Sequence, residues 1–121
     1  MGTDFHQGAT LRFTADKRLA AAAGGVTRYF ADAAGMEADA VARLQAATLA
    51  VCAAAIAHLV SAGAQLSVEV TRFADRIEIA VSYPGAHLEK VAALPGVDRI
   101  DRETREGAAV TRLTKFIGKI L

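Results

Sequence analysis

The spacing of the apolar residues changes once along the chain, and this change constrains the fold more than any other feature. Up to about residue 62 apolar residues recur at three- and four-residue steps, and most of the 28 alanines lie within 15–62. From residue 65 apolar residues such as Leu66 and Val68 alternate with polar ones. The first spacing predicts helices, which alanine favours because it loses no side-chain entropy, and the second predicts half-buried strands. A chain of 121 residues with this pattern is expected to be a single domain, 1–121.

The pattern predicts the following elements along the chain. We expect a strand over 9–14, a helix from Asp16 to about Ala34, a helix from Met36 until Gly63 stops it, strands over 65–71 and 77–82 joined near Ala74 and Asp75, a short helix over 87–94 and a closing helix over 108–121. Within the first helix, Leu19, Val26 and Phe30 are expected on the inner face, with Asp16 as N-cap and Gly35 as C-cap. The second helix is expected to be the most buried.

This order predicts an α+β fold, a two-layer α/β sandwich in which a mixed or antiparallel sheet is covered by helices on one face. The clean alternation in the two central strands leaves the other face of the sheet wet or covered by a partner. The run from Asp98 to Glu106 mixes charges residue by residue, which is typical of a solvated loop; the alternative is a lid that recognises a partner.

Composition and charge exclude several classes of protein. A formal net charge of +1 gives no strong attraction for nucleic acid or an anionic membrane, and no apolar run reaches the roughly 18 residues that span a bilayer. The lone Cys52 excludes a disulfide framework inside the chain and is interpreted as a small buried hydrophobe. The first residues, MGTDFHQGATL, have no signal-peptide pattern, so a cytoplasmic protein is expected.

The segment 49–58, LAVCAAAIAH, carries a resemblance to a known family. Together with the order of elements over 11–121, it resembles the anti-sigma factor serine kinases, small proteins of the histidine-kinase-like (GHKL) ATPase fold. Those kinases carry a Ser-Glu-Ala-x-x-Asn-Ala-x-x-His helix signature, in which the Glu is the base or positions water and the Asn holds magnesium. Here Ala50 and Ala54 occupy those two positions, and His58 matches the signature His.

Two further family motifs are also degenerate in this chain. In the Asp-x-Gly-x-Gly motif that binds adenine, Tyr83 replaces the Asp, Gly85 is retained and His87 replaces the second Gly. The Gly-x-Gly-Leu motif, which opens the last helix and holds phosphates, is matched only by Gly107. The resemblance therefore implies a retained fold whose ATP site has been lost, with Tyr83 or His87 filling the adenine space as a secondary hypothesis.

We interpret the chain as a non-catalytic regulatory protein-binding domain in bacterial signalling, with no catalytic residue, no metal and no cofactor. The resemblance implies a protein partner, either a sigma factor or its antagonist, and a homodimer. The alternatives are an active ATP- and magnesium-dependent serine/threonine kinase and an unrelated dimerisation module. The carboxylates available to a kinase are Glu37, Asp39, Asp75 and Glu89, none at the family's spacing.

The histidines fit structural roles better than chemical ones. His58 lies near the end of an apolar helix, where a histidine satisfies the last carbonyl groups. His6, His58 and His87 are far apart in the sequence and no Cys/His spacing matches a zinc site, so no metal centre is expected.

Overall fold

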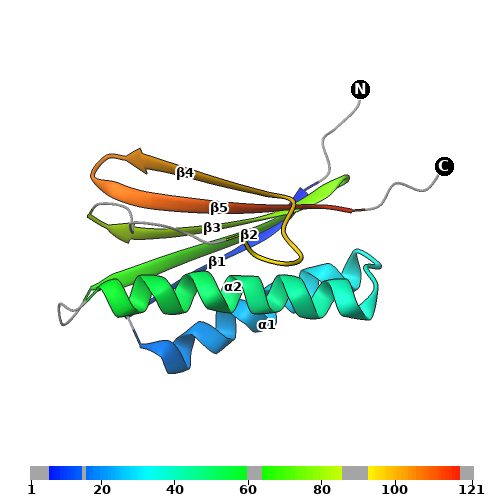
Figure 1. The fold of residues 1–121 in the computed structure, drawn as a ribbon, viewed down its shortest axis with the longest axis horizontal. Helices are drawn as coiled ribbons and strands as arrows, with labels where there is room; N and C mark the ends of the chain where they lie inside the picture. Colours follow the sequence, from blue (N-terminus) through cyan, green and yellow to red (C-terminus); the bar gives the residue numbers. More distant parts are fainter. Residues whose placement is uncertain (1–5, 15, 60–63, 86–92, 118–121) are drawn as a thin grey trace.

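A computed structural model describes residues 6–14, 16–59, 64–85 and 93–117. The elements are β1 (His6–Thr14), α1 (Lys17–Ala33), α2 (Ala38–His58), β2 (Gln65–Phe73), β3 (Arg76–Pro84), β4 (Arg99–Arg105) and β5 (Ala108–Phe116). Figure 1 shows them in two layers, with the sheet on one side and both helices on the other. The predicted α+β fold with helices on one face of a sheet is confirmed.

The sheet has five strands in the order β1-β2-β3-β5-β4, and every pairing is antiparallel. Val68 of β2 lies opposite Leu11 of β1 and Val81 of β3, so apolar side chains align across the strands on one face. That face packs against the helices, with α1 over β1, β2 and β3 and α2 over β3 and β5. The helix-facing residues of β2 and β3 are fully or almost fully buried.

Helix α1 begins and ends close to the predicted residues. Asp16 is the N-cap, because its side chain accepts a hydrogen bond from the backbone N–H of Arg18 at 2.9 Å. The C-cap is Ala34, and Gly35 follows it with a φ of +83°, the left-handed conformation that commonly ends a helix. The Arg18 guanidinium, which also donates to Asp16, holds the pKa of that carboxyl below its ordinary value.

The inner face of α1 differs in part from the prediction. Phe30 is buried as expected, and Val26 is half-buried, but Leu19 is 42% exposed. Small residues occupy much of the inner face instead, including Ala20, Ala23 and Thr27. Alanine carries no periodic signal of its own in an alanine-rich segment, so the larger apolar residues dominated the predicted face.

Helix α2 begins at Ala38 and ends at His58, whereas the prediction ran from Met36 to Gly63, and Gly63 lies outside the described residues. The prediction that α2 is the most buried helix is not supported, since a similar share of residues is buried in α1. The inner face of α2 includes Leu44 and Val51, which are 0% and 4% exposed. A hydrogen bond of 3.2 Å between the buried hydroxyls of Thr27 and Thr48 joins α1 to α2. In the described part, this helix is also the one long and apolar enough to cross a membrane by length and composition, a test that buried core helices pass as well.

The closing segment is a strand, not the predicted helix. Ala109, Thr111 and Leu113 of β5 face the helices, while Val110 is buried on the other face. Because β5 lies between β3 and β4 and has buried residues on both faces, its apolar residues fall at spacings that imitate a helix. The segment thus forms the second strand of a hairpin with β4, and the prediction of a helix over 108–121 is wrong for its described residues.

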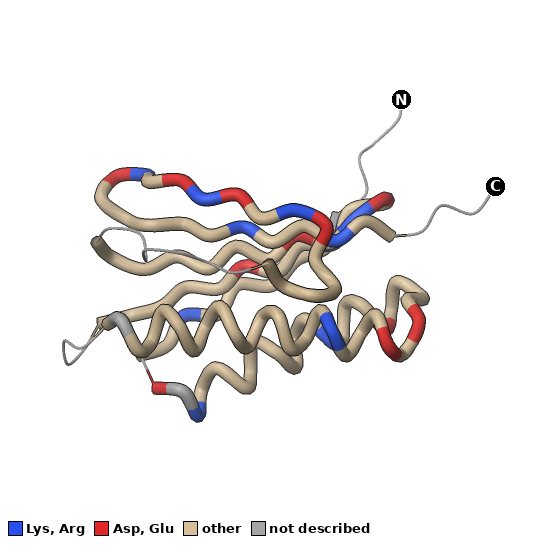
Figure 2. The backbone as a smooth tube through the Cα atoms, in the orientation of Figure 1, with Lys and Arg blue, Asp and Glu red and all other residues tan. Residues whose placement is uncertain are grey.

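The segment predicted as a solvated loop over 98–106 is largely strand β4, which forms one edge of the sheet. Figure 2 shows positive and negative residues alternating along it, whereas much of the length of α2 carries no charge. Charged residues on an edge strand hinder pairing with other chains, which explains why this strand has the mixed charges that are typical of a solvated loop. Most of the short helix predicted over 87–94 falls outside the described residues.

Candidate functional site

The segments that the resemblance assigns to a nucleotide site meet at one end of the sheet. Because β2 and β3 are antiparallel, with Ser67 opposite Ser82, the end of β3 lies at the same end of the sheet as the start of β2, which follows α2 in the chain. The turn between β4 and β5 is there too, since Tyr83 is opposite Ala109. Figure 1 shows the C-terminal end of α2, the end of β3 and this turn together on the left.

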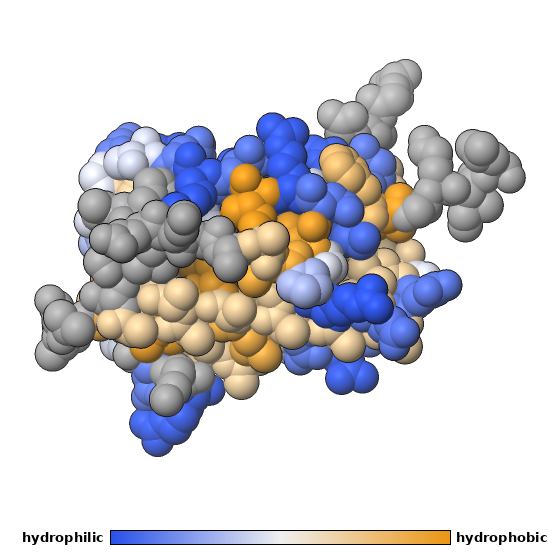
Figure 3. All heavy atoms as spheres, in the orientation of Figure 1, coloured by the Kyte–Doolittle hydropathy of each residue, from blue (hydrophilic) through white to orange (hydrophobic). Residues whose placement is uncertain are grey.

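Ala50 and Ala54 lie on α2 and are exposed. Nearly whole helical turns separate Arg43 from Ala50 and Ala54, so all three residues lie on the same side of α2. At Arg43 this side faces the described residues before β4. Gly96 lies directly against Arg43, because a Cβ added to Gly96 would be 2.5 Å from the Arg43 Cβ. The two alanines therefore lie on the same side of α2 as Arg43, which Gly96 contacts. Figure 3 shows mostly apolar residues along this side of the molecule, between the charged sheet and the charged helix ends.

Tyr83 is part of the hydrophobic core and is 2% exposed. Its burial follows from the alternation of β3, in which Ile77, Ile79 and Val81 face the helices as Tyr83 does. The aromatic ring thus fills space between the sheet and the helices at the end of β3.

Gly85 and Gly107 are brought into contact. The N–H of Gly85 donates a hydrogen bond of 3.0 Å to the carbonyl oxygen of Gly107. Glu106 and Gly107 form the two-residue turn between β4 and β5, with φ values of 52° and 80°, which is why a glycine is favoured there. The prediction that Gly107 opens a helix is wrong, since it belongs to a hairpin. His58 is the last residue of α2, and His87 lies outside the described residues.

The described residues offer limited chemistry at this end of the sheet. The methyl groups of Ala50 and Ala54 neither ligate a cation nor accept a proton. Among the described residues no group of three His, Cys, Asp or Glu side chains could hold a metal ion. Of the carboxylates considered for a kinase, Glu37 and Asp75 line a hollow of about 790 Å³ at the opposite end of the molecule, where α2 begins. Asp39 lies in the first turn of α2, also at that end, and Glu89 falls outside the described residues.

No protein-family model and no curated protein matches this chain.

The open face of the sheet carries a continuous charge network that the sequence analysis did not identify. Glu78 accepts a hydrogen bond of 2.7 Å from Arg76 Nε and lies 3.8 Å from Arg112 Nε through its other oxygen. Arg112 in turn lies 3.5 Å from Glu103, which accepts a 2.7 Å hydrogen bond from Arg105. This hydrogen bond to the Glu78 carboxylate raises the pKa of Arg76 above its ordinary value. The alternation of apolar and polar residues predicted that Glu78 faces away from the core. Arg112 joins the network only because 108–116 is a strand, which the sequence did not predict.

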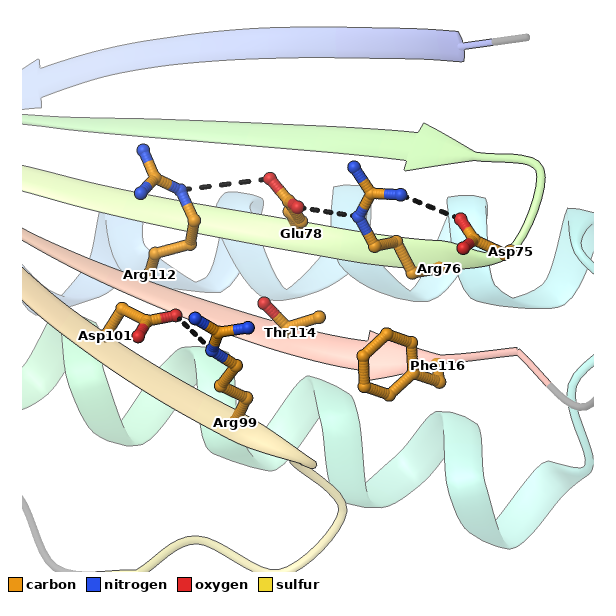
Figure 4. A pocket seen from close by; sticks show the side chains of 8 residues that line it. All are labelled: Asp75, Arg76, Glu78, Arg99, Asp101, Arg112, Thr114 and Phe116. Atoms are coloured by element: carbon orange, nitrogen blue, oxygen red, sulfur yellow. Dashed lines mark hydrogen bonds and ion pairs between the residues drawn. The ribbon is translucent and has the colours of Figure 1, made fainter. Parts of the chain in front are cut away.

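Two shallow hollows flank this network, of about 430 and 340 Å³. Both are lined by Glu78 and Arg112, and the larger one also by Arg99, Asp101 and Phe116 (Figure 4). Because the acidic and basic side chains neutralise one another, the surface does not favour a ligand of one charge. The arrangement suits contact with a polar surface better than capture of a small ion.

Cys52 has no nucleophilic role in this structure. Its side chain is fully buried, and burial raises the pKa of the thiol to about 12. The thiolate that reacts with disulfide reagents is therefore scarce at neutral pH. We expect negligible labelling of the native protein at pH 8 over minutes and complete labelling in denaturant, measured with a chromogenic disulfide reagent. Rapid labelling of the native chain would contradict this burial.

Proposed function

We propose that this protein is a non-catalytic regulatory protein-binding domain of the anti-sigma factor serine kinase type, with a GHKL-like fold whose ATP site has been lost. The observation that carries the proposal is the exposed pair Ala50 and Ala54, on the same side of α2 as Arg43, which Gly96 contacts. Where the resembled family places a base and a magnesium ligand, this helix presents two methyl groups.

The expected loss of nucleotide affinity is large. A hydrogen bond to a charged group contributes about 1.5–3 kcal/mol, and each 1.4 kcal/mol corresponds to about a tenfold change in affinity. Removal of the Glu, Asn and Asp functions together removes most of the binding energy. Without the magnesium ligand phosphoryl transfer is lost as well, because that reaction depends on positioning and on charge stabilisation by the metal.

The proposal includes a protein partner, a sigma factor or an antagonist of one, together with a homodimer and a cytoplasmic location. The formal net charge of +1 and the neutralised charges of the open sheet face argue against nucleic acid and membrane surfaces as partners. An uncharged stretch of α2 and the charge network on the sheet give the molecule two different faces, which suits contacts with two proteins.

Titration calorimetry with ATP and ADP, with and without magnesium, tests the loss of the site. We expect no heat of binding and no shift in Tm at millimolar nucleotide. The matched variant is Ala54→Arg, which places a long side chain at the exposed position. Micromolar binding by the natural chain that Ala54→Arg abolishes would contradict the proposal and favour the active kinase.

Purification of the tagged full chain from its own host, with cross-linking and mass spectrometry, tests the partner. Recovery of a sigma factor or its antagonist, reconstituted afterwards from purified components, supports the proposal. A chain that binds neither protein in the reconstituted mixture and is monomeric throughout would contradict it.

A further inference from the structure

The two edges of the sheet differ in how they are protected from pairing with other chains. Strand β4 carries charged side chains at five of its seven positions. Strand β1, at the other edge, has nine residues, no proline and Arg12 as its one Lys, Arg, Asp or Glu. No described residue pairs with the outer side of β1. Natural edge strands avoid association through charges, prolines or bulges, and β1 uses little of this protection.

The side of α1 that faces beyond β1 is apolar. Five residues recur there at alternating three- and four-residue steps, which places them along one side of the helix. They are Leu19, Ala22, Val26, Tyr29 and Ala33. Leu19 and Tyr29 are 42% and 68% exposed, and they are two of the three large hydrophobic side chains exposed in the described part of the chain. The side of α1 toward α2 is different, because Gly24 lies there against Leu49.

We propose that β1 and this side of α1 form an interface with a second copy of the same chain. The two β1 strands pair antiparallel about a two-fold axis near Thr10, so that the two sheets become one sheet of ten strands. A two-fold axis through a residue keeps side chains of the same face together, because opposite residues then have the same alternation. Ala9 meets the partner's Leu11 on the helix-facing side, and all nine residues of β1 find a partner. The inference names the interface of the homodimer included in the proposed function and rests on that part of it alone.

The spacing of the layers explains why large side chains are exposed on α1. Helix α1 packs over β1, β2 and β3, so its centre lies near β2. Pairing of the β1 edges then separates the two α1 helices by three strand spacings, roughly 14 Å. Closely packed helices are about 8–10 Å apart, so this gap requires protruding side chains to fill it. Leu19 and Tyr29, which the isolated chain leaves in water, supply that volume.

Charges at the two ends of α1 are complementary in the same arrangement. The chain runs about 13 Å from Thr10 to the end of β1, and α1 then runs back antiparallel to this strand. About nine helical residues cover the same distance, which places the two-fold axis near Gly25. Arg18 and Asp32 lie seven residues before and after Gly25. Their side chains are 87% and 58% exposed, and within the chain Arg18 pairs with Asp16 at 2.8 Å while Asp32 lies 3.7 Å from Arg28. The two-fold axis therefore places Arg18 of one copy level with the partner's Asp32, and the reverse contact is made at the other end.

Sedimentation equilibrium of the full chain over micromolar concentrations tests the inference. We expect a dimer of twice 12.6 kDa. The double variant Leu19→Glu/Tyr29→Glu is expected to weaken dimerisation at least about 100-fold, because it places charges at the centre of the contact. The matched control is Phe116→Glu, which alters the third exposed large hydrophobic, on β5, and leaves the dimer intact. Circular dichroism verifies that each variant folds. A monomeric natural chain, or a dimer lost in the control and kept in the double variant, overturns the inference.

Two further experiments, a swap of charged residues and amide hydrogen exchange, distinguish this interface from other modes of dimerisation. Arg18→Asp is expected to weaken the dimer several-fold, and the double exchange Arg18→Asp/Asp32→Arg to restore it, which a purely structural effect on α1 would not do. Amide exchange in β1 is expected to slow at alternate residues as protein concentration rises. A dimer without this protection in β1 overturns the inference, while the calorimetric test of nucleotide binding is unaffected by either result.

Discussion

Replacement of Leu113 by alanine is expected to lower the free energy of unfolding by about 2–5 kcal/mol, the range for truncation of a large buried side chain. Leu113 is 0% exposed and lies opposite Ile79 and Ile100 in the middle of the sheet. The cost includes the lost burial of its methyl groups and the cavity left between the sheet and the helices. Urea denaturation measures the change from the shift in the midpoint at constant slope.

Phe116→Ala on the same strand is the control for this prediction, and its expected cost is about 1 kcal/mol, because the ring is 49% exposed. The pair also distinguishes the strand from the helix that the sequence predicted over 108–121. A helix would place Leu113 and Phe116 on one inner face, so that the two truncations would be similarly costly. Equal losses of stability in the two variants would contradict the strand.

Gly96→Ala is expected to lower the free energy of unfolding by about 2–5 kcal/mol, through two independent effects. Gly96 has a φ of +86°, a left-handed conformation that costs an L residue about 1–2 kcal/mol. Its added Cβ would lie 2.5 Å from the Arg43 Cβ and 3.1 Å from the Arg43 carbonyl carbon, and such overpacking costs about 1–3 kcal/mol. The contact holds the segment before β4 against α2, so this end of the loop should loosen first.

Gly35→Ala is the matched control, because Gly35 has nearly the same φ of +83° but nothing within 4 Å of an added Cβ. It is expected to lose only the conformational part, about 1–2 kcal/mol. Thermal or urea unfolding of both variants isolates the packing contribution as their difference. If the two substitutions cost the same, segment 93–97 does not pack against α2 as described.

Local patterns were sufficient for the elements from β1 to β3. The alternating residues of β2 and β3 gave two strands with the correct buried faces, and the cap at Asp16 and the Gly35 stop placed α1 to within about one residue. These features depend on period, capping and turn chemistry, which neighbouring residues determine. The candidate site was predicted only through the resemblance, since alanine carries no chemical signal by itself.

The tertiary structure decided the last two strands, β4 and β5. Whether 108–116 forms a helix or a strand depends on β3 and β4, which pair on both sides of it and bury residues on both of its faces. The same pairing brings Gly107 to Gly85 and Arg112 to Glu78, contacts between segments far apart in the sequence. The sequence by itself determined the helices α1 and α2 and the central hairpin of β2 and β3. The strand order and the weakly protected edge at β1 could be identified only from the tertiary structure. Hydrogen bonds and burial between distant segments override the local spacing of apolar residues.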